Sequence, residues 1–280
     1  GLGLCDIRTV DFYATQIKLP ENNFEKLLDE YARYSPAELV VNTAMGNSEK
    51  ELNIMKDRNN TFVTVRDDKM FEQDSQMLLN LYTVVDGFDK PKEEFYDEDL
   101  IVCAINGLIN YFTETQKVKL EHLNKIQVYE VKKYMSLDIN ARRSLELTER
   151  MRDKSKKGTL IWVLDKTSTS MGGRLLRRWI NDPLLNVEEI NERLEAVKEL
   201  KDNMMLRGDI QELLKKVYDI ERLAGKISYG NANARDMISL RNSLSNLPEL
   251  KQILGMANAP LLKKLYERLD ELKDIHNLIE

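Results

Sequence analysis

Apolar residues in the first 116 positions alternate between short β-type runs and helical spacings. The runs at 4–10, 12–17, 37–41 and 61–65 are rich in β-branched and aromatic residues and predict strands, the first two forming a hairpin around Val10 and Asp11. Apolar positions three and four residues apart predict helices after Asn22 or Asn23, after Ser48, over 71–85 and over 100–112. This alternation predicts an α/β sheet domain over residues 1–116.

Only helical spacings remain over residues 117–280. A helix capped by Asp138 is expected to present one face made of Leu137, Ala141, Leu145, Thr148 and Met151. A helix from Ser170 to Pro183 is expected to bury Met171, Leu175, Leu176, Trp179 and Ile180. Further helices are predicted after Asn186, over 206–217 and 220–227, from Asn233 to Pro248, and from Leu261 onward. The second part is therefore expected to be all-α.

The two tryptophans of the chain lie close together in the sequence. Trp162 belongs to the apolar run 160–164, and Trp179 belongs to the helix that starts at Ser170. Because aromatic side chains bury large areas, we expect Trp162 and Trp179 to form a structural hub around which the helical part packs.

Composition indicates a globular chain with a charged surface. Of its 280 residues, 42% are apolar and 32% are charged, and the net charge is −5, so the chain as a whole does not carry the basic footprint of a nucleic-acid-binding module. No apolar run is long enough to cross a membrane and no signal peptide is present, which favours a cytoplasmic protein without membrane partners. The Gly-Leu-Gly start and the last helix, which has no stop signal before Glu280, predict a piece of a longer protein.

The sequence offers no recognisable metal or nucleotide site. Cys5 and Cys103 are expected to be buried free thiols, and His122 and His276 have no cluster of ligands around them. No GxxxxGK[ST] phosphate-binding loop occurs. We therefore expect no catalytic, cofactor-binding or metal-binding residues in the chain.

Three segments resemble the MutS family of DNA mismatch-repair proteins. LDINARRSLELTERMRDKSKKGTLIWVLDKTSTSMGGRLLRRWINDPL, from Leu137 to Leu184, is similar to the opening of the family's helical core domain. DIERLAGKISYGNANARDMISLRNSLSNLPEL, from Asp219 to Leu250, is similar to a later core segment, although Ala234 replaces a usual proline and Lys226 a frequent arginine. The stretch CDIRTVDFYAT, from Cys5 to Thr15, resembles the family's connector domain.

The resemblance implies an RNase H-like mixed-sheet connector domain at 1–116, then a helical core domain at 117–280 that reaches the start of a long lever helix. It implies that the intact parent is a dimeric, DNA-dependent ATPase that uses ATP and Mg²⁺ and clamps mismatched duplex DNA. In that parent, these domains link the DNA-binding and ATP-binding ends as an allosteric relay, and the connector meets MutL. The chain itself is then expected not to be an enzyme.

Two alternatives remain open. An RNase H-like fold can host a Mg²⁺-dependent nuclease, which needs three or four converging carboxylates, and Asp6 and Asp11 are candidates at the predicted hairpin. The other candidates, Asp57, Asp67, Asp68 and Asp86, lie in predicted turns without evident convergence. The chain could instead be a generic helical adaptor, because fold does not imply function.

Five arginines are candidates for interdomain or phosphate contacts. Arg142 and Arg143 lie on one predicted helix, and Arg174, Arg177 and Arg178 lie on the helix from Ser170. Lys and Arg neutralise phosphates without reading sequence. Acidic neighbours such as Glu146, Glu149 and Asp182 favour solvated or interdomain ion pairs over phosphate binding.

Overall fold

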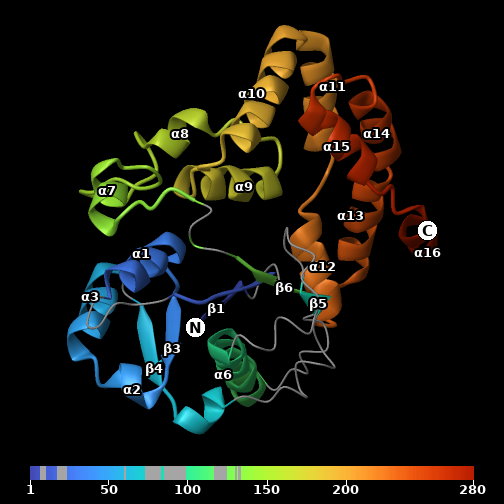
Figure 1. Cartoon of the computed structure of the whole chain (residues 1–280). Helices are drawn as coiled ribbons and strands as arrows, with labels where there is room; N and C mark the ends of the chain where they lie inside the picture. Colours follow the sequence, from blue (N-terminus) through green and yellow to red (C-terminus); the bar gives the residue numbers. More distant parts are fainter. Residues whose placement is uncertain are drawn as a thin grey trace. The chain divides into compact units, whose positions relative to one another are not determined.

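The computed structural model describes residues 1–6, 11–17, 24–59, 61–72, 83–84, 99–116, 125–129, 131 and 134–280. These residues divide into two compact units, Gly1–Arg142 and Arg143–Glu280 (Figure 1). The first unit extends past the expected boundary at 116/117, because strand β6 (Lys125–Val128) pairs within the sheet of that unit.

A four-stranded mixed sheet organises the first unit. Its strands β1 (Leu2–Asp6), β2 (Asp11–Thr15), β6 and β5 (Thr83–Val84) lie in the order β1-β2-β6-β5. β1 and β2 pair antiparallel, as the hairpin prediction requires, and β6 runs parallel to both β2 and β5. The mixed sheet is confirmed; the hairpin turn itself lies outside the described residues.

The prediction of one helix over 71–85 is wrong at both of its described ends. Phe71 closes a short 3₁₀ helix, η1 (Asp68–Phe71), which Asp67 caps by accepting a hydrogen bond from the Lys69 amide over 2.9 Å. Thr83 and Val84 form strand β5, where their β-branched side chains favour extended backbone. The remainder of that predicted helix lies outside the described residues.

Helix α6 (Asp99–Gln116) packs against β1, β2 and η1, and it extends past the predicted end at Phe112. Its apolar face and the two central strands form a buried core of Phe12, Ala14, Ile101, Val102, Ile105, Ile109, Phe112 and Ile126. Asn106 and Asn110 donate side-chain hydrogen bonds to the carbonyl oxygens of Glu72 and Met70, each over 2.9 Å. These two bonds hold the η1 segment against the helix. Cys5 and Cys103 are free thiols, as predicted, but only half-buried.

A smaller parallel sheet joins β3 (Glu38–Val41) to β4 (Phe62–Val65). Helix α1 (Glu25–Tyr34) ends at Ser35, which adopts a left-handed conformation, and α3 (Glu49–Asn59) follows Ser48 as predicted. The one-turn helix α2 (Thr43–Gly46) was not predicted; Asn42 caps it by accepting a hydrogen bond from the Met45 amide over 3.0 Å. Tyr31, Val41, Leu52 and Met55 form the core here.

A buried ion pair anchors the chain where it leaves the large sheet. Arg33 and Glu30 pair over 3.3 Å on α1, and Tyr129, just after β6, donates a hydrogen bond to Glu30 over 2.9 Å. The Arg33 guanidinium lies 5.1 Å from the ring centroid of Tyr129 and 4.7 Å from that of Tyr134. The segment that follows β6 is thus held against α1 by charge and aromatic contacts.

Helix α7 (Ile139–Ser144) lies at the division between the units and is shorter than predicted. Asp138 caps it, accepting hydrogen bonds from the amides of Asn140 and Ala141 over 2.7 and 2.8 Å. The helix does not continue to Met151, because Glu146 takes a left-handed conformation (φ 44°) and its carboxylate accepts a hydrogen bond from the Met151 amide.

The elements of the second unit are helices joined by turns and loops. After α7 come α8 (Leu160–Leu164), α9 (Ser170–Asn181), α10 (Val187–Asp202), α11 (Met204–Lys215), α12 (Ile220–Ser228), α13 (Ala234–Leu244), α14 (Leu247–Leu254), α15 (Pro260–Arg268) and α16 (Lys273–Ile279). Figure 1 shows α10 and α11 as an antiparallel pair, with α14 packed against α11 and α15 against α10. Leucines from α11 to α15 dominate the core, and Ala196 joins it from α10. Side chains of Asn186, Asn203, Asp219 and Asn233 cap the helices that follow them.

Two predicted features near the C-terminus are wrong. Pro248 does not end a helix: α13 stops at Leu244 and Pro248 lies in the first turn of α14, where its missing N–H costs nothing. The long helix expected from Leu261 is broken, because α15 ends at Arg268 and Leu272 adopts a left-handed conformation (φ 50°) before α16. No start of a long lever helix is present in this part of the described chain.

No helix among the described residues has both the length and the apolar character needed to span a membrane.

Candidate interdomain contact site

The apolar run 160–164 forms the single-turn helix α8. Thr159, almost fully buried, caps it by accepting a hydrogen bond from the Trp162 amide over 3.3 Å, and its hydroxyl donates to the Lys156 carbonyl over 2.7 Å. A single turn can bury only one side of itself. Ile161 is buried, whereas Trp162 is 48% exposed and its neighbours Leu160, Val163 and Leu164 are exposed as well.

Helix α9 begins as predicted but buries none of its residues. Thr169 caps it by accepting a hydrogen bond from the Gly172 amide over 3.0 Å. Leu175 is exposed and Trp179 is 39% exposed, while Met171, Leu176 and Ile180 are half-buried. The expected burial of this helix and of the two tryptophans is therefore wrong within the described chain: Met171, Leu176 and Ile180 are covered only in part, and Leu175, Trp179 and Trp162 are exposed.

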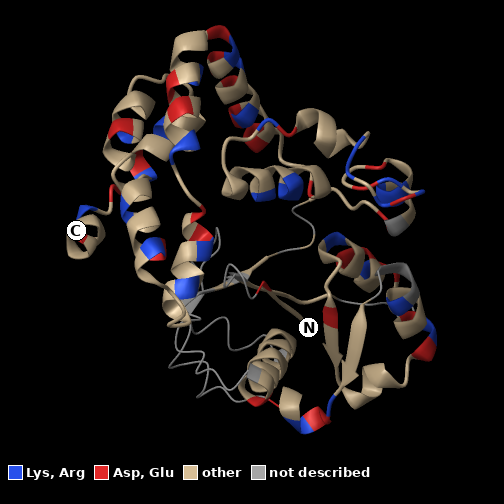
Figure 2. Cartoon of the chain, turned by 180° about the vertical axis from the view of Figure 1, so that it is seen from behind, with Lys and Arg blue, Asp and Glu red and all other residues tan. Residues whose placement is uncertain are grey.

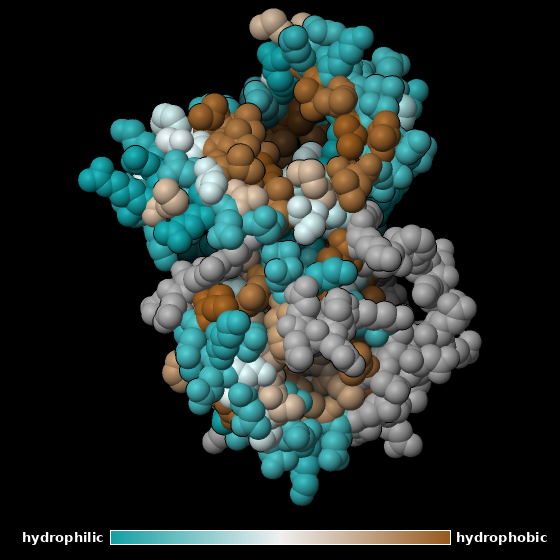
Figure 3. Space-filling model, turned by 60° about the vertical axis from the view of Figure 1, so that its left-hand side comes forward, coloured by the Kyte–Doolittle hydropathy of each residue, from teal (hydrophilic) through white to brown (hydrophobic). Residues whose placement is uncertain are grey.

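Exposed apolar side chains continue from α8 to the start of α11. We call this set the open apolar face: Leu160, Trp162, Val163, Leu164, Leu175, Trp179, Leu185, Val187, Leu194, Val197, Met204 and Met205. Figure 3 shows hydrophobic residues gathered over the helical unit beside a hollow in its surface. Concentrated apolar exposure of this kind marks interaction surfaces.

Arg193 of α10 stacks on the indole ring of Trp179. Its guanidinium carbon lies 3.7 Å from the ring centroid, a close cation–π contact. The contact ties α9 to α10 and leaves the other side of the indole available. Trp179 is thus held in position at the surface rather than buried in a core.

Arg174 of α9 forms ion pairs with two carboxylates at the start of α12. Its guanidinium donates two parallel hydrogen bonds to Asp219, over 2.8 and 2.7 Å, and also pairs with Glu221. Hydrogen bonding with Asp219 raises the pKa of Arg174, and the bond from Arg174 lowers the pKa of Asp219. Asp219 also caps α12, so the pair fixes α9 against the start of that helix. The proposed phosphate contact of Arg174 is not favoured, because its donors are already engaged.

The other candidate arginines do not converge with Arg174. Arg177 and Arg178 are exposed on α9, and Arg143 is exposed on α7. Arg142 is half-buried and donates from Nε to the Leu137 carbonyl over 3.0 Å. The five arginines thus lie on two helices, α7 and α9.

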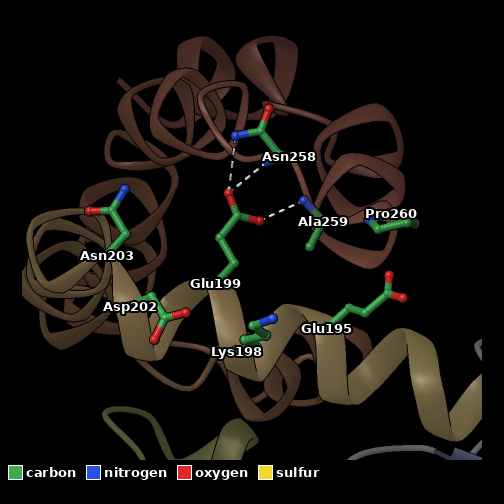
Figure 4. A pocket seen from close by; sticks show the side chains of 8 residues that line it. All are labelled: Glu195, Lys198, Glu199, Asp202, Asn203, Asn258, Ala259 and Pro260. Atoms are coloured by element: carbon green, nitrogen blue, oxygen red, sulfur yellow. Dashed lines mark hydrogen bonds between the residues drawn. The ribbon is translucent and has the colours of Figure 1, made fainter.

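A shallow cleft lies between α10 and the start of α15, and no sequence motif predicted it. It encloses about 590 Å³ and is lined by Glu195, Lys198, Glu199, Asp202, Asn203, Asn258, Ala259 and Pro260 (Figure 4). Glu199 points across it and accepts hydrogen bonds from the Asn258 and Ala259 amides over 2.7 and 2.5 Å, and these bonds lower its pKa although desolvation opposes them. The Glu199 carboxylate thus accepts hydrogen bonds at the start of α15, and these bonds connect α10 to α15 across the cleft.

The carboxylates considered for a nuclease do not form a site in the described residues. Asp6 and Asp11 are register partners in the β1–β2 hairpin. Asp67 caps η1, and Asp68 accepts a hydrogen bond from the Thr43 amide over 2.9 Å. Within the described ranges, no group of three or more His, Cys, Asp or Glu side chains could hold a metal ion. Asp86 lies outside those ranges, as do the side chains of Asp11 and Asp57.

The described residues thus form a mixed α/β unit and a helical unit that exposes many apolar side chains. Comparison with known sequences identifies both units. The family described as MutS domain II matches residues 1–127, and MutS domain III matches residues 140–280. The chain therefore belongs to the MutS family of DNA mismatch-repair proteins.

Relatives named DNA mismatch repair protein MutS match along the whole chain. That of Ruminiclostridium cellulolyticum is 46% identical over 280 residues, covering 100% of this chain and 32% of the relative. That of Clostridium novyi is 44% identical over 279 residues, covering 100% of this chain and 30% of the relative. The chain thus spans about a third of the length of the relatives it matches. The two matched families are domains II and III, and neither is an ATPase domain.

Proposed function

We propose that this chain is the connector and the first part of the helical core of a mismatch-recognition ATPase, and that it relays between the DNA-binding and ATP-binding parts of that protein. The matches to domains II and III support the position in the parent protein. The open apolar face is the observation that carries the relay, because such a surface in a domain of this kind is expected to pack on other parts of the same protein.

The relay requires surfaces that transmit a rigid-body shift. Arg174 with Asp219, and Arg193 with Trp179, link α9 to α12 and to α10. A displacement of a neighbouring domain pressed on α9 would then be passed to α10 and α12 through these fixed contacts. The relay is a coupling free energy between nucleotide binding and DNA binding, so its test must measure how one changes the other.

The test uses the full-length protein with Trp179→Ala. Affinity for mismatched duplex DNA is measured with ADP and with a non-hydrolysable ATP analogue. The ratio of these two affinities measures the coupling between nucleotide binding and DNA binding. We expect the ratio to shrink in Trp179→Ala and to stay unchanged in the control Ile238→Ala, which removes an exposed apolar side chain of α13. Circular dichroism checks folding. An unchanged ratio in a folded Trp179→Ala protein would refute the relay.

We propose further that the first unit is an RNase H-like connector that docks MutL. The β1–β2 hairpin with parallel β6 and β5 supports the fold proposal, and the match to domain II supports the connector role. The boundary is placed after β6 instead of at 116/117, since removing β6 would take a central strand from the sheet. In the parent, ATP with Mg²⁺, mismatched duplex DNA and a second subunit are the proposed ligands and partners.

Docking is tested by titrating MutL against the whole chain and against residues 1–142, each checked for folding. Equal affinities would assign docking to the first unit. No binding by either would mean that docking needs the nucleotide-loaded parent, and the docking proposal for this chain would be abandoned. The nuclease alternative is not favoured by the family match, and a Mg²⁺-dependent cleavage assay on an RNA–DNA hybrid with Asp6→Asn as control would detect it.

A further inference from the structure

The segment between α7 and α8 is a folded loop. Its base is closed by hydrogen bonds from the Leu160 and Ile161 amides to the carbonyls of Glu146 and Leu147, over 3.3 and 2.9 Å. Its tip is closed by a hydrogen bond from the Arg150 amide to the Ser155 carbonyl over 3.0 Å. The backbone of the loop is therefore set by its own hydrogen bonds.

Left-handed backbone at three residues shapes this loop: Glu146 at its base, and Lys154 and Gly158 farther along. Lys154 has φ 53° and Gly158 has φ 94°. The Lys154 amide donates to the Arg150 carbonyl over 3.1 Å, and the buried Thr159 hydroxyl anchors the C-terminal end. From Met151 to Gly158 every residue except Ser155 is exposed. The tip of the loop is thus almost entirely exposed to solvent.

The tip of this loop, Arg150–Gly158, is the basic loop. It carries five basic residues and one acidic residue in a chain whose net charge is −5. Figure 2 shows Lys and Arg gathered on the loop between α7 and α8. The positive charge is local, so overall composition does not account for it.

Three nearby carboxylates have partners within the loop and its flanks, while Glu149, directly before the tip, is exposed. Asp153 accepts a hydrogen bond from the Ser155 amide over 3.1 Å and pairs with Arg150 over 3.5 Å. Asp165 pairs with Lys156 over 2.7 Å. Glu146 accepts from the Met151 amide over 2.8 Å. These contacts neutralise Arg150 and Lys156 locally.

Three cations of the basic loop remain directed to solvent. Arg152, Lys154 and Lys157 are exposed, and no described residue forms an ion pair with any of them. They lie within six residues of one another on a backbone that is already ordered, so little conformational entropy is lost when they meet an anionic surface.

We propose that the basic loop contacts the sugar-phosphate backbone of duplex DNA, without reading base sequence. Duplex DNA offers about one negative charge per 1.7 Å of axis, so an exposed loop with three separated cations can meet several phosphates without a pocket. An acidic peptide would need walls that hold its side chains, and an exposed loop supplies none. This contact is additional to the relay and does not depend on it.

The test measures binding of a fluorescein-labelled, fully paired duplex to the 280-residue chain by anisotropy over a range of salt concentrations. In the variant Arg152→Gln, Lys154→Gln, Lys157→Gln, we expect the slope of log K against log salt to fall in magnitude by about 2.7, which is about 0.9 for each lost phosphate contact. Circular dichroism confirms that the variant is folded.

A matched control removes the same charge elsewhere on the helical unit. Lys198→Gln, Lys201→Gln, Lys215→Gln changes three exposed lysines of α10 and α11 and should leave the slope unchanged. Three results would overturn the proposal: no binding by the unaltered chain at low salt, equal slopes in the unaltered chain and the basic-loop variant, or equal losses in the two variants. Preferential binding of poly-glutamate through the same three residues would assign the loop to an acidic protein instead.

Discussion

The guanidinium of Arg174 and the carboxylate of Asp219 form a two-bond ion pair between α9 and the cap of α12. The side chain of Asp219 is 16% exposed and that of Arg174 is 30% exposed, so solvent screens the pair only partly. The same carboxylate accepts a hydrogen bond from the Arg222 amide over 3.3 Å. Asp219 thus both pairs with Arg174 and caps α12. The pair connects α9 to α12 through two residues that lie 45 positions apart in the sequence.

We expect Arg174→Ala to destabilise the chain by about 2 kcal/mol, because it leaves Asp219 without its main charged donor. Arg177→Ala, an exposed residue one turn away on α9, should change stability by less than about 0.5 kcal/mol. Urea unfolding followed by circular dichroism gives both values. Equal stabilities of the two variants would mean that the ion pair does not hold α9 in place.

The same pair predicts a dependence of stability on pH. The bond from Arg174 lowers the pKa of Asp219 below its ordinary value of 3.8. A carboxyl whose pKa is lower in the folded state stabilises the fold above its unfolded pKa, and this contribution is lost as the pH falls through the folded value. The stability difference between the unaltered chain and Asp219→Asn should therefore be constant from pH 7 to about pH 5 and shrink below about pH 4. Thermal unfolding at several pH values measures it, and a constant difference down to pH 3 would contradict the assignment.

Sequence patterns predicted the helices and strands whose signals are local. Asp138, Asn186 and Asn233 cap the predicted helices, and Pro183 follows the end of α9. These signals depend on one side chain and the next few amides. The parallel pairing of β6 with β2 could not be derived, because it joins segments more than 100 residues apart in the chain.

Predictions that assumed burial from spacing failed for α9, where Leu175 and Trp179 are exposed. Trp179 lies on a helix with perfect amphipathic spacing, yet it is exposed. Spacing identifies the apolar side of a helix, but it does not say what packs on that side. The Arg174–Asp219 pair was not predicted either. Its two residues belong to helices that were predicted separately, and spacing within a helix does not show which other helix it contacts.

Tryptophan fluorescence tests the exposure directly. In single-tryptophan variants made with Trp162→Phe or Trp179→Phe, acrylamide should quench the remaining tryptophan efficiently, and Trp162 more than Trp179, because Arg193 covers one face of Trp179. In the full-length protein, the proposed interface should reduce quenching at both positions. Equal quenching in the chain and in the full-length protein would show that nothing covers the open apolar face.

The buried ion pair of the first unit predicts a large effect from a single substitution. Arg33→Met removes the cation that pairs with Glu30, a residue only 6% exposed, and leaves a buried carboxylate. We expect a loss of about 3 kcal/mol, whereas the double variant Glu30→Gln, Arg33→Met should lose less, because no buried charge remains. Urea unfolding of the three proteins compares them. A double variant less stable than Arg33→Met alone would rule out charge burial as the cause.

Two glycines in helix interiors should respond to alanine in opposite directions. A Cβ at Gly107 of α6 would lie 2.3 Å from ring atoms of Phe71, whereas a Cβ at Gly208 of α11 would meet no atom within 4 Å. Phe71 cannot withdraw freely, because Asn106 and Asn110 hold the backbone on both sides of it. We therefore expect Gly107→Ala to destabilise the first unit by about 1–3 kcal/mol.

Gly208→Ala should stabilise the second unit by about 0.5–1 kcal/mol, since alanine loses less backbone entropy in a helix and no clash opposes it. Chemical denaturation of both variants measures the two changes. The double variant Gly107→Ala, Phe71→Leu provides a further test, because a smaller side chain at 71 makes room for the new methyl group. Recovery of part of the lost stability would identify the clash with Phe71 as the cause, and no recovery would point to strain within α6 itself.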